Sequence, residues 1–376
     1  MNLNTALTNI KLISNGTITE GKAVLISGSK IIDVVDEAAI PGSFDKINFH
    51  GNYLSPGLID LQVYGSGGKL FSGNPSVDVL RQMEDDFIKQ GTTGFFATPA
   101  TNSTAVIERA IDAGREYSKQ SKGVFLGLHV EGPYINPKRK GAHPEEYIKK
   151  ATLTEVKNWV ERGEGIIKMM TIAPELQDCE VIDYLFDQGI IISSGHSDAT
   201  YEQASAFFGG KIKAATHLYN AMPQMHHRLP GLIPAIFEKK PYTSIVPDGI
   251  HVSYPMLALG KRELGDKLFL ITDAVTETTE GEHQHKLNVD HYTMNGTISG
   301  SALTMLKGVA NCVNYAGISL AEAINMASLY PAQLASLTKK GKIEAGFDAD
   351  VLIFNDKFTP VATVLQGEII KHEQNN

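Results

Sequence analysis

Short apolar runs alternate with amphipathic segments through the middle of this chain. A short apolar run bounded by turns is typical of a strand buried on both faces of a parallel sheet. Eight such runs predict strands at residues 54–62, 94–98, 124–131, 166–172, 190–196, 213–217, 243–248 and 267–273. The segments between them include predicted helices at residues 77–90, 104–119, 152–162 and 175–188. The third of these helices begins with a capping-box pattern, Thr152-Leu153-Thr154-Glu155.

Strands that alternate with helices in this way predict an α/β protein built as a (β/α)8 TIM-like barrel. A doubly wound open sheet uses the same alternation, and the number of strands alone does not close a barrel. Both ends of the chain instead show short strand patterns without intervening helices, and each set alone would be marginally stable. We therefore expect a small, discontinuous β-sandwich domain from residues 1–52 and 343–376, and a barrel from residues 53–342.

Composition narrows the class of protein. Hydrophobic residues make up 42% of the 376 residues and charged residues 20%, which is ordinary for a globular enzyme. No apolar run approaches the ~20 residues that cross a bilayer, and we expect no signal peptide. A formal net charge of −8 argues against broad nucleic-acid binding but permits a small anionic substrate. Two cysteines far apart in the sequence indicate no disulfide framework, which favours the cytoplasm.

Polar side chains stand at the ends of four predicted strands. They are Glu131, His196, His217 and Asp273. A single polar residue at a strand end is more often structural than functional. Four of them point to a shared site, because the carboxyl ends of barrel strands meet at one face of the molecule.

These residue types suit a metal centre. Glu131, His196 and His217 offer one oxygen and two nitrogens, a set that suits zinc with a fourth position open to water. Iron, cobalt or manganese could occupy the same set. A bound divalent ion lowers the pKa of water toward ~7. Asp273 is then the natural base, and it could later protonate a leaving group. A helix N-cap is the structural alternative for Asp273.

Five short motifs fall at these strand ends. They read PGLID at residues 56–60, HVEGP at 129–133, SGH at 194–196, THLYNAM at 216–222 and TDA at 272–274. Together they resemble the amidohydrolase superfamily and, within it, the deacetylases that act on N-acetylglucosamine 6-phosphate. The resemblance covers nearly the whole chain. It implies a metal-dependent hydrolase that forms glucosamine 6-phosphate and acetate, with a terminal β domain and a homodimeric assembly.

The resemblance also implies roles for individual residues. Glu131, His196 and His217 would hold one divalent metal ion, and Asp273 would transfer protons. His143 matches a residue that polarises the acetyl carbonyl, where an imidazole N–H can stabilise an oxyanion.

Further positions match residues that contact the sugar or its phosphate. Gly132, Asn220, Ala221 and His251 fall in this group. Arg228 matches an arginine that binds phosphate, often in the site of the neighbouring subunit. A guanidinium suits a phosphate dianion because it donates paired hydrogen bonds.

One departure from the superfamily concerns the first strand. Many members carry His-x-His there and bind a second metal ion, whereas this chain has Gln62 and Tyr64, which are poor ligands beside imidazole. We therefore predict one tightly bound metal ion, with Gln62 as a secondary site residue. His129 is expected to support Glu131 rather than to bind the ion, as residues around metal ligands commonly do.

Two other functions remain open at this point. One is an amidohydrolase that acts on a cyclic amide or imide, and the other is a non-catalytic barrel assembly protein. The presence of Glu131, His196, His217 and Asp273 counts against the second. The polar stretch 280–290, with His283 and His285, is expected to form a flexible or hairpin excursion without a role in the site.

Overall fold

The computed structural model describes residues 4–278, 284–294 and 296–372. The chain divides into two compact units. One is formed by Met1–Asp60, Asp85–Gly94 and Thr304–Asn376, and the other by Leu61–Glu84 and Phe95–Leu303. The second unit carries the polar strand ends identified above.

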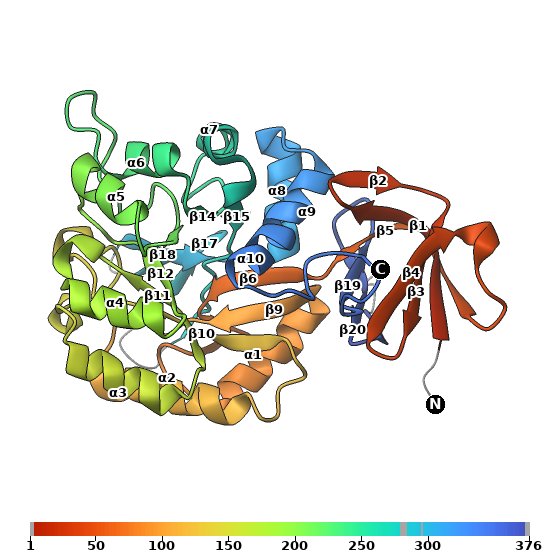
Figure 1. The fold of residues 1–376 in the computed structure, drawn as a ribbon, viewed down its shortest axis with the longest axis horizontal. Helices are drawn as coiled ribbons and strands as arrows, with labels where there is room; N and C mark the ends of the chain where they lie inside the picture. Colours follow the sequence, from red (N-terminus) through yellow and green to blue (C-terminus); the bar gives the residue numbers. More distant parts are fainter. Residues whose placement is uncertain (1–3, 279–283, 295, 373–376) are drawn as a thin grey trace. The chain divides into compact units, whose positions relative to one another are not determined.

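An eight-stranded sheet runs in the order β15-β14-β13-β12-β11-β10-β9-β6, and β9 to β15 pair in parallel (Figure 1). Its strands are β6 (Leu58–Val63), β9 (Thr92–Ala97), β10 (Phe125–Glu131), β11 (Ile167–Ile172), β12 (Ile191–Ser194), β13 (Ala214–Ala215), β14 (Tyr242–Ile245) and β15 (Leu268–Leu270). Their burial pattern is almost continuous, as expected when both faces are covered.

Backbone hydrogen bonds close this sheet. The N–H of Asp273 donates to the carbonyl of Gln62 at 3.1 Å, and the N–H of Tyr64 donates to the carbonyl of Ala274 at 2.9 Å. These bonds join the end of β6 to the segment that follows β15. An open doubly wound sheet would lack such a closure, so the predicted barrel is confirmed.

Helices follow most of the strands and cover the outside of the barrel (Figure 1). They are α1 (Val77–Lys89), α2 (Thr104–Tyr117), α3 (Leu153–Gly163), α4 (Cys179–Asp187), α5 (Tyr201–Phe208), α6 (Leu232–Lys239) and α7 (Tyr254–Leu264). The hydroxyl of Thr152 accepts from the N–H of Glu155 and caps α3, as the capping pattern predicts.

The helix predicted at residues 175–188 begins later than expected. A short 3-10 turn forms at Pro174–Leu176, and α4 starts only at Cys179. The carboxylate of Glu175 accepts from the hydroxyl of Ser197 at 2.7 Å and from the N–H of Asp198 at 2.8 Å. These bonds hold the turn against the loop after β12, so Glu175 serves that loop rather than α4.

Strands from the two ends of the chain share one sheet in the other unit. Its order is β21-β20-β19-β5-β1-β3-β4, with β2 paired to β1. Leu54 of β5 lies opposite Ile353 of β19, which joins the N-terminal and C-terminal strands. The strands are β1 (Asn4–Ser14), β2 (Thr17–Thr19), β3 (Lys22–Ser27), β4 (Lys30–Asp36), β5 (Asp45–Pro56), β19 (Val351–Phe354), β20 (Pro360–Leu365) and β21 (Glu368–Lys371).

Three helices belong to this β-rich unit as well. They are α8 (Met305–Ala316), α9 (Leu320–Ala327) and α10 (Leu329–Leu334). The termini therefore form a common β-rich unit, whereas the domain limits at residues 53 and 342 stay a proposal.

Small sheets complete the fold. Two short strands, β7 (Gly65–Ser66) and β8 (Lys69–Leu70), pair after β6. The strands β16 (Lys286–Asn288), β17 (His291–Met294) and β18 (Thr297–Ser301) form an antiparallel sheet, which includes the expected hairpin. His283 lies outside the described residues. Among the helices that the structure describes, none combines the length and the apolar character that crossing a membrane requires.

A buried carboxylate anchors the start of β10, the strand that carries Glu131. The side chain of Glu84 on α1 is fully buried. It accepts from the hydroxyls of Tyr117 and Ser121, each at 2.5 Å. It also accepts from three backbone N–H groups at 3.0 Å, at residues 122, 124 and 125. Glu84 therefore fixes the segment that enters β10.

Replacing Glu84 by Gln should lower the free energy of unfolding by about 3 kcal/mol, because the amide cannot accept all of these hydrogen bonds. Urea denaturation measures this change. Glu116→Gln, on the exposed face of α2, is the matched control and should stay within about 0.5 kcal/mol of the parent protein. Equal stabilities for the two variants would contradict the role of Glu84.

Candidate active site

Three donor atoms converge at the carboxyl end of the barrel. Oε1 of Glu131 lies 3.1 Å from Nε2 of His217 and 3.5 Å from Nε2 of His196. The two Nε2 atoms are 3.1 Å apart, and all three side chains are buried. The structure thus brings together the three residues that the sequence predicts as metal ligands.

The spacing of these atoms fits a divalent metal ion. Ligand bonds of about 2.0–2.2 Å at tetrahedral angles place neighbouring ligand atoms about 3.3–3.6 Å apart, close to the 3.1–3.5 Å between these three atoms. Nδ1 of His196 lies 2.7 Å from the carbonyl oxygen of Arg139, so Nδ1 carries the hydrogen and Nε2 presents a lone pair. Nδ1 of His217 is buried and has no hydrogen-bond partner among the described residues. The donor set, its spacing and the tautomer of His196 all suit a bound cation.

The charges at this point also favour a cation. Burial alone would raise the pKa of Glu131, but the neighbouring imidazoles of His143, His196 and His217 hold that pKa well below its usual range. Burial lowers the pKa of His217, but its hydrogen bond to Glu131 outweighs this effect and the pKa is raised. Glu131 therefore carries a negative charge in a site that excludes most water.

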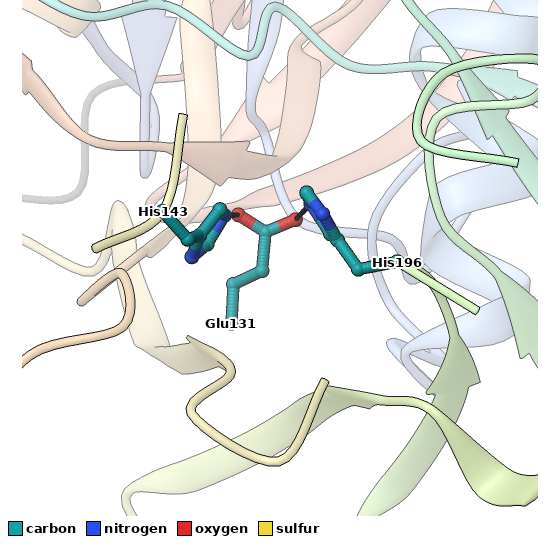
Figure 2. Close-up of side chains that lie close together, drawn as sticks. All are labelled: Glu131, His143 and His196. Carbon is teal, nitrogen blue, oxygen red and sulfur yellow. Dashed lines mark ion pairs between the residues drawn. The ribbon is translucent and has the colours of Figure 1, made fainter. Parts of the chain in front are cut away.

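His143 approaches Glu131 from the other side. Figure 2 shows the carboxylate of Glu131 between the rings of His143 and His196. Nε2 of His143 lies 3.4 Å from Oε2 of Glu131, and its Nδ1 lies 2.6 Å from the hydroxyl of Thr101. The potential metal-binding atoms of Glu131, His143 and His196 lie within 4.8 Å of one another. Those of Glu131, His196 and His217 are closer together, at 3.1–3.5 Å. The Thr101 contact orients His143 beside the donor set.

Asp273 is connected to the donor set through Gln62. The side-chain amide of Gln62 lies 2.8 Å from Oδ1 of Asp273 and 3.0 Å from Oε1 of Glu131. Burial raises the pKa of Asp273 above its ordinary value, against the opposing charge of His217. A carboxylate with a raised pKa beside a metal site is a candidate proton acceptor.

These side chains open onto a cavity of about 320 Å³. Small-molecule sites are typically about 300–1,000 Å³ in volume. The predicted site residues that line the cavity are Glu131, His143, His196, His217, Asn220, Ala221, His251 and Asp273. Asp248 holds the ring of His251 in the lining of the cavity, because Oδ2 of Asp248 lies 2.5 Å from Nδ1 of His251. Asp248 also accepts the backbone N–H groups of Ile250 and His251.

Other predicted site residues lie outside the cavity lining. Gln62 is buried behind it, 1% exposed, and acts through its hydrogen bonds. Gly132 follows β10 at a φ of 74°, where an added Cβ would lie 2.0 Å from the Thr101 hydroxyl. Arg228 is exposed on the segment between β13 and α6 and is not among the described residues that line the cavity.

His129 lies in the interior of the barrel. Its Nδ1 is 2.9 Å from the carbonyl of Leu61, and its Nε2 is 2.7 Å from the hydroxyl of Thr171. Burial lowers the pKa of His129 from 6.5 to about 4, so the ring is neutral at pH 7. His129 therefore braces β6 against β11, and any effect on the donor set runs through those strands.

Glu131 is the last residue of β10, but the other three site residues come after their strands have ended. Strands β12, β13 and β15 end at Ser194, Ala215 and Leu270, two or three residues earlier than predicted. The backbone of His196, His217 and Asp273 has positive φ, at 48°, 38° and 54°. Non-glycine residues rarely adopt this region, and it often marks functional sites. The positive φ falls in the turn after the strand, at the residue whose side chain lines the cavity.

The cavity also has a wall that the sequence did not predict. His285 and Ser299 both line it, and Nδ1 of His285 lies 2.8 Å from the hydroxyl of Ser299. No role was expected for His285, because it lies in a polar stretch without a strand-end pattern. The sheet of β16, β17 and β18 carries this segment, and backbone hydrogen bonds of Ser301 in β18 with Asp273 and Val275 join that sheet to the barrel.

Replacing His217 by Asn should weaken zinc binding by more than about 100-fold, because loss of a direct ligand costs more than loss of a supporting residue, worth about 10- to 100-fold. Metal analysis of the dialysed protein measures the loss. His226→Asn, an exposed histidine outside the cavity, is the control and should keep its metal. A His217 variant with full metal content would remove His217 from the donor set.

Comparisons with known proteins identify the relationship. The model of the amidohydrolase family matches residues 53–370. N-acetylglucosamine-6-phosphate deacetylase of Haemophilus influenzae is 35% identical over 96% of this chain and 98% of its own length. The crystal structure of the Pasteurella multocida enzyme of that name has a TM-score of 0.93 at 34% identity, covering 98% of this chain and 100% of that chain. N-acetylgalactosamine-6-phosphate deacetylase of a Shewanella species is 30% identical over 96% of this chain and 94% of its own length.

A match of this extent, on a closed barrel with converging Glu131, His196 and His217, shows that the chain belongs to the amidohydrolase family.

Proposed function

We propose that this protein removes the acetyl group from N-acetylglucosamine 6-phosphate and releases glucosamine 6-phosphate and acetate. The convergence of Glu131, His196 and His217 beside Asp273 carries this proposal. The relationship to N-acetylglucosamine-6-phosphate deacetylases over nearly the whole chain supports the choice of substrate.

We assign one divalent metal ion to this site, with zinc as the best fit to one oxygen and two imidazole nitrogens. Glu131, His196 and His217 would hold it, although iron, cobalt or manganese could use the same ligands. A divalent ion bound there activates water and polarises the substrate carbonyl. The neighbouring residues then determine where protons and the substrate go.

Asp273 is assigned the proton transfers. It accepts a proton from the attacking water and delivers it to the departing amine nitrogen, which must be protonated to leave. Gln62 donates to Oδ1 of Asp273 at 2.8 Å and keeps the carboxylate at the edge of the donor set. A nearby cation favours the ionised form of Asp273 and so opposes the effect of burial.

His143 is assigned to the developing oxyanion. Nδ1 of His143 lies 2.6 Å from the hydroxyl oxygen of Thr101 and can accept a hydrogen bond from it. In that tautomer the imidazole carries its own hydrogen on Nε2. His143 lines the cavity, and its Nε2–H would stabilise negative charge on the carbonyl oxygen in place of its 3.4 Å contact with Oε2 of Glu131.

The sugar and its phosphate group are assigned to the part of the cavity lining formed by His251, Asn220 and Ala221. Asp248 orients His251 there. Gly132 is assigned to substrate contact through its backbone, since it follows β10 directly. Arg228 is exposed on its own chain, so we propose that it serves the site of a second subunit in a homodimer.

The other hydrolase function considered, cleavage of a cyclic amide or imide, is not favoured. The relatives that match the whole chain are named as deacetylases of acetylated amino-sugar phosphates. A non-catalytic assembly protein is not favoured either, because the donor set and Asp273 are all in place.

Asp273→Asn should lower kcat for N-acetylglucosamine 6-phosphate by about 10³-fold, because general acid–base catalysis typically contributes about 10²–10⁴-fold. An acetate-release assay measures the rate, and metal analysis should find the ion retained. Asp290→Asn, at an exposed position in the β16–β17 hairpin, is the control. Wild-type turnover in the Asp273 variant would refute its role.

Arg228→Ala should raise KM for N-acetylglucosamine 6-phosphate by about 10- to 100-fold, since a hydrogen bond to a charged group contributes about 1.5–3 kcal/mol. The KM for unphosphorylated N-acetylglucosamine should not change. Arg262→Ala, an exposed arginine on α7, provides the matched control. An equal rise in KM for both sugars would show that Arg228 does not bind the phosphate.

A further inference from the structure

The two oxygens of Glu131 have different neighbours. Oε1 faces His217 and His196 at 3.1 and 3.5 Å. Oε2 faces His143 at 3.4 Å and accepts the phenol hydrogen of Tyr64. Oε1 therefore lies with the two imidazole nitrogens that could bind a metal ion. Oε2 instead faces groups that donate hydrogen bonds to it.

Tyr64 reaches this position from the end of β6. Gln62 and Tyr64 are two residues apart, so their side chains leave this extended segment on the same face. Both are largely buried, with exposed fractions of 1% and 8%. They stand where many amidohydrolases carry two histidines, but here the pair donates to Glu131 instead of offering lone pairs to a second ion.

Gln62 also holds Tyr64 in place. The side-chain nitrogen of Gln62 has two hydrogens. The acceptors within its reach include the Tyr64 oxygen at 2.9 Å, Oε1 of Glu131 at 3.0 Å and Oδ1 of Asp273 at 2.8 Å. A cation on Oε1 would remove one of these acceptors from the competition. Tyr64 and Asp273 would remain within hydrogen-bond distance of the Gln62 nitrogen.

We propose that Tyr64 is a positioning residue that holds Oε2 of Glu131 away from the metal ion, so that Glu131 binds the ion through Oε1 alone. The hydrogen-bond chain Gln62 to Tyr64 to Glu131 supports the ligand much as a carboxylate supports a metal-bound histidine. This inference rests on the proposed metal site, but it concerns metal binding and not the identity of the sugar.

Zinc titration of the metal-free, full-length protein tests the proposal, with a chromophoric chelator as competitor and no sugar present. Tyr64→Phe should raise the Kd for zinc by about 10- to 100-fold. Tyr117→Phe removes another buried phenol that donates to a carboxylate, that of Glu84, and should change the Kd by less than about threefold. Unchanged zinc affinity in the Tyr64 variant would overturn the proposal.

A measurement on the unmodified protein covers the case in which Tyr64→Phe does not fold. The zinc-minus-apo infrared difference spectrum separates a carboxylate that binds through one oxygen from one that binds through both. We expect the wide splitting of the carboxylate bands that marks binding through one oxygen. The narrow splitting of binding through both oxygens would overturn the proposal.

Deacetylase activity separates this inference from the proposed function. If the zinc and infrared results are as expected but no acetate is released from N-acetylglucosamine 6-phosphate, the proposed function fails and the role of Tyr64 stands. If acetate is released but zinc affinity is independent of Tyr64, the role of Tyr64 fails and the proposed function stands.

Discussion

The site depends on one buried carboxylate. Glu131 is 1% exposed, and an isolated charge at that depth would cost several kcal/mol, a large part of a protein's typical net stability. Its charge is retained because imidazole, amide and phenol groups from several strand ends surround its two oxygens. The strands that carry those groups must pair in the correct register to bring them to Glu131. The barrel therefore has to be closed and correctly ordered before the carboxylate can be accommodated.

Closure of the barrel and assembly of the site use the same residues. The backbone of Gln62 and Asp273 forms one closing hydrogen bond, and their side chains form another. Tyr64 closes the barrel through its N–H and contacts Glu131 through its phenol. A change at the end of β6 should consequently affect the barrel seam and the donor set together. Glu84, which fixes the entry to β10, connects the same site to the outer helices.

Much of this arrangement follows from the sequence, because the side chains at the ends of barrel strands must converge. Glu131, His196, His217 and Asp273 could be named from apolar runs that end in polar residues. The residues at which the strands end could not be predicted, because a run of apolar residues does not reveal the positive φ at His196 or His217. His285 also escaped prediction, because its place at the cavity depends on the pairing of β16, β17 and β18 and not on a local pattern. The hydrogen bond from Tyr64 to Glu131 joins residues far apart in the chain. The spacing of apolar and polar residues along the sequence does not predict such a contact.

The central claim is that Glu131, His196 and His217 bind a single divalent ion beside Asp273. Anomalous diffraction at the zinc edge, from crystals of the zinc-loaded protein, tests it most directly. The account predicts one zinc peak per chain, with the two Nε2 atoms and Oε1 of Glu131 as its protein ligands and Asp273 adjacent. A peak bound by other residues, or no peak between these three side chains, would contradict it.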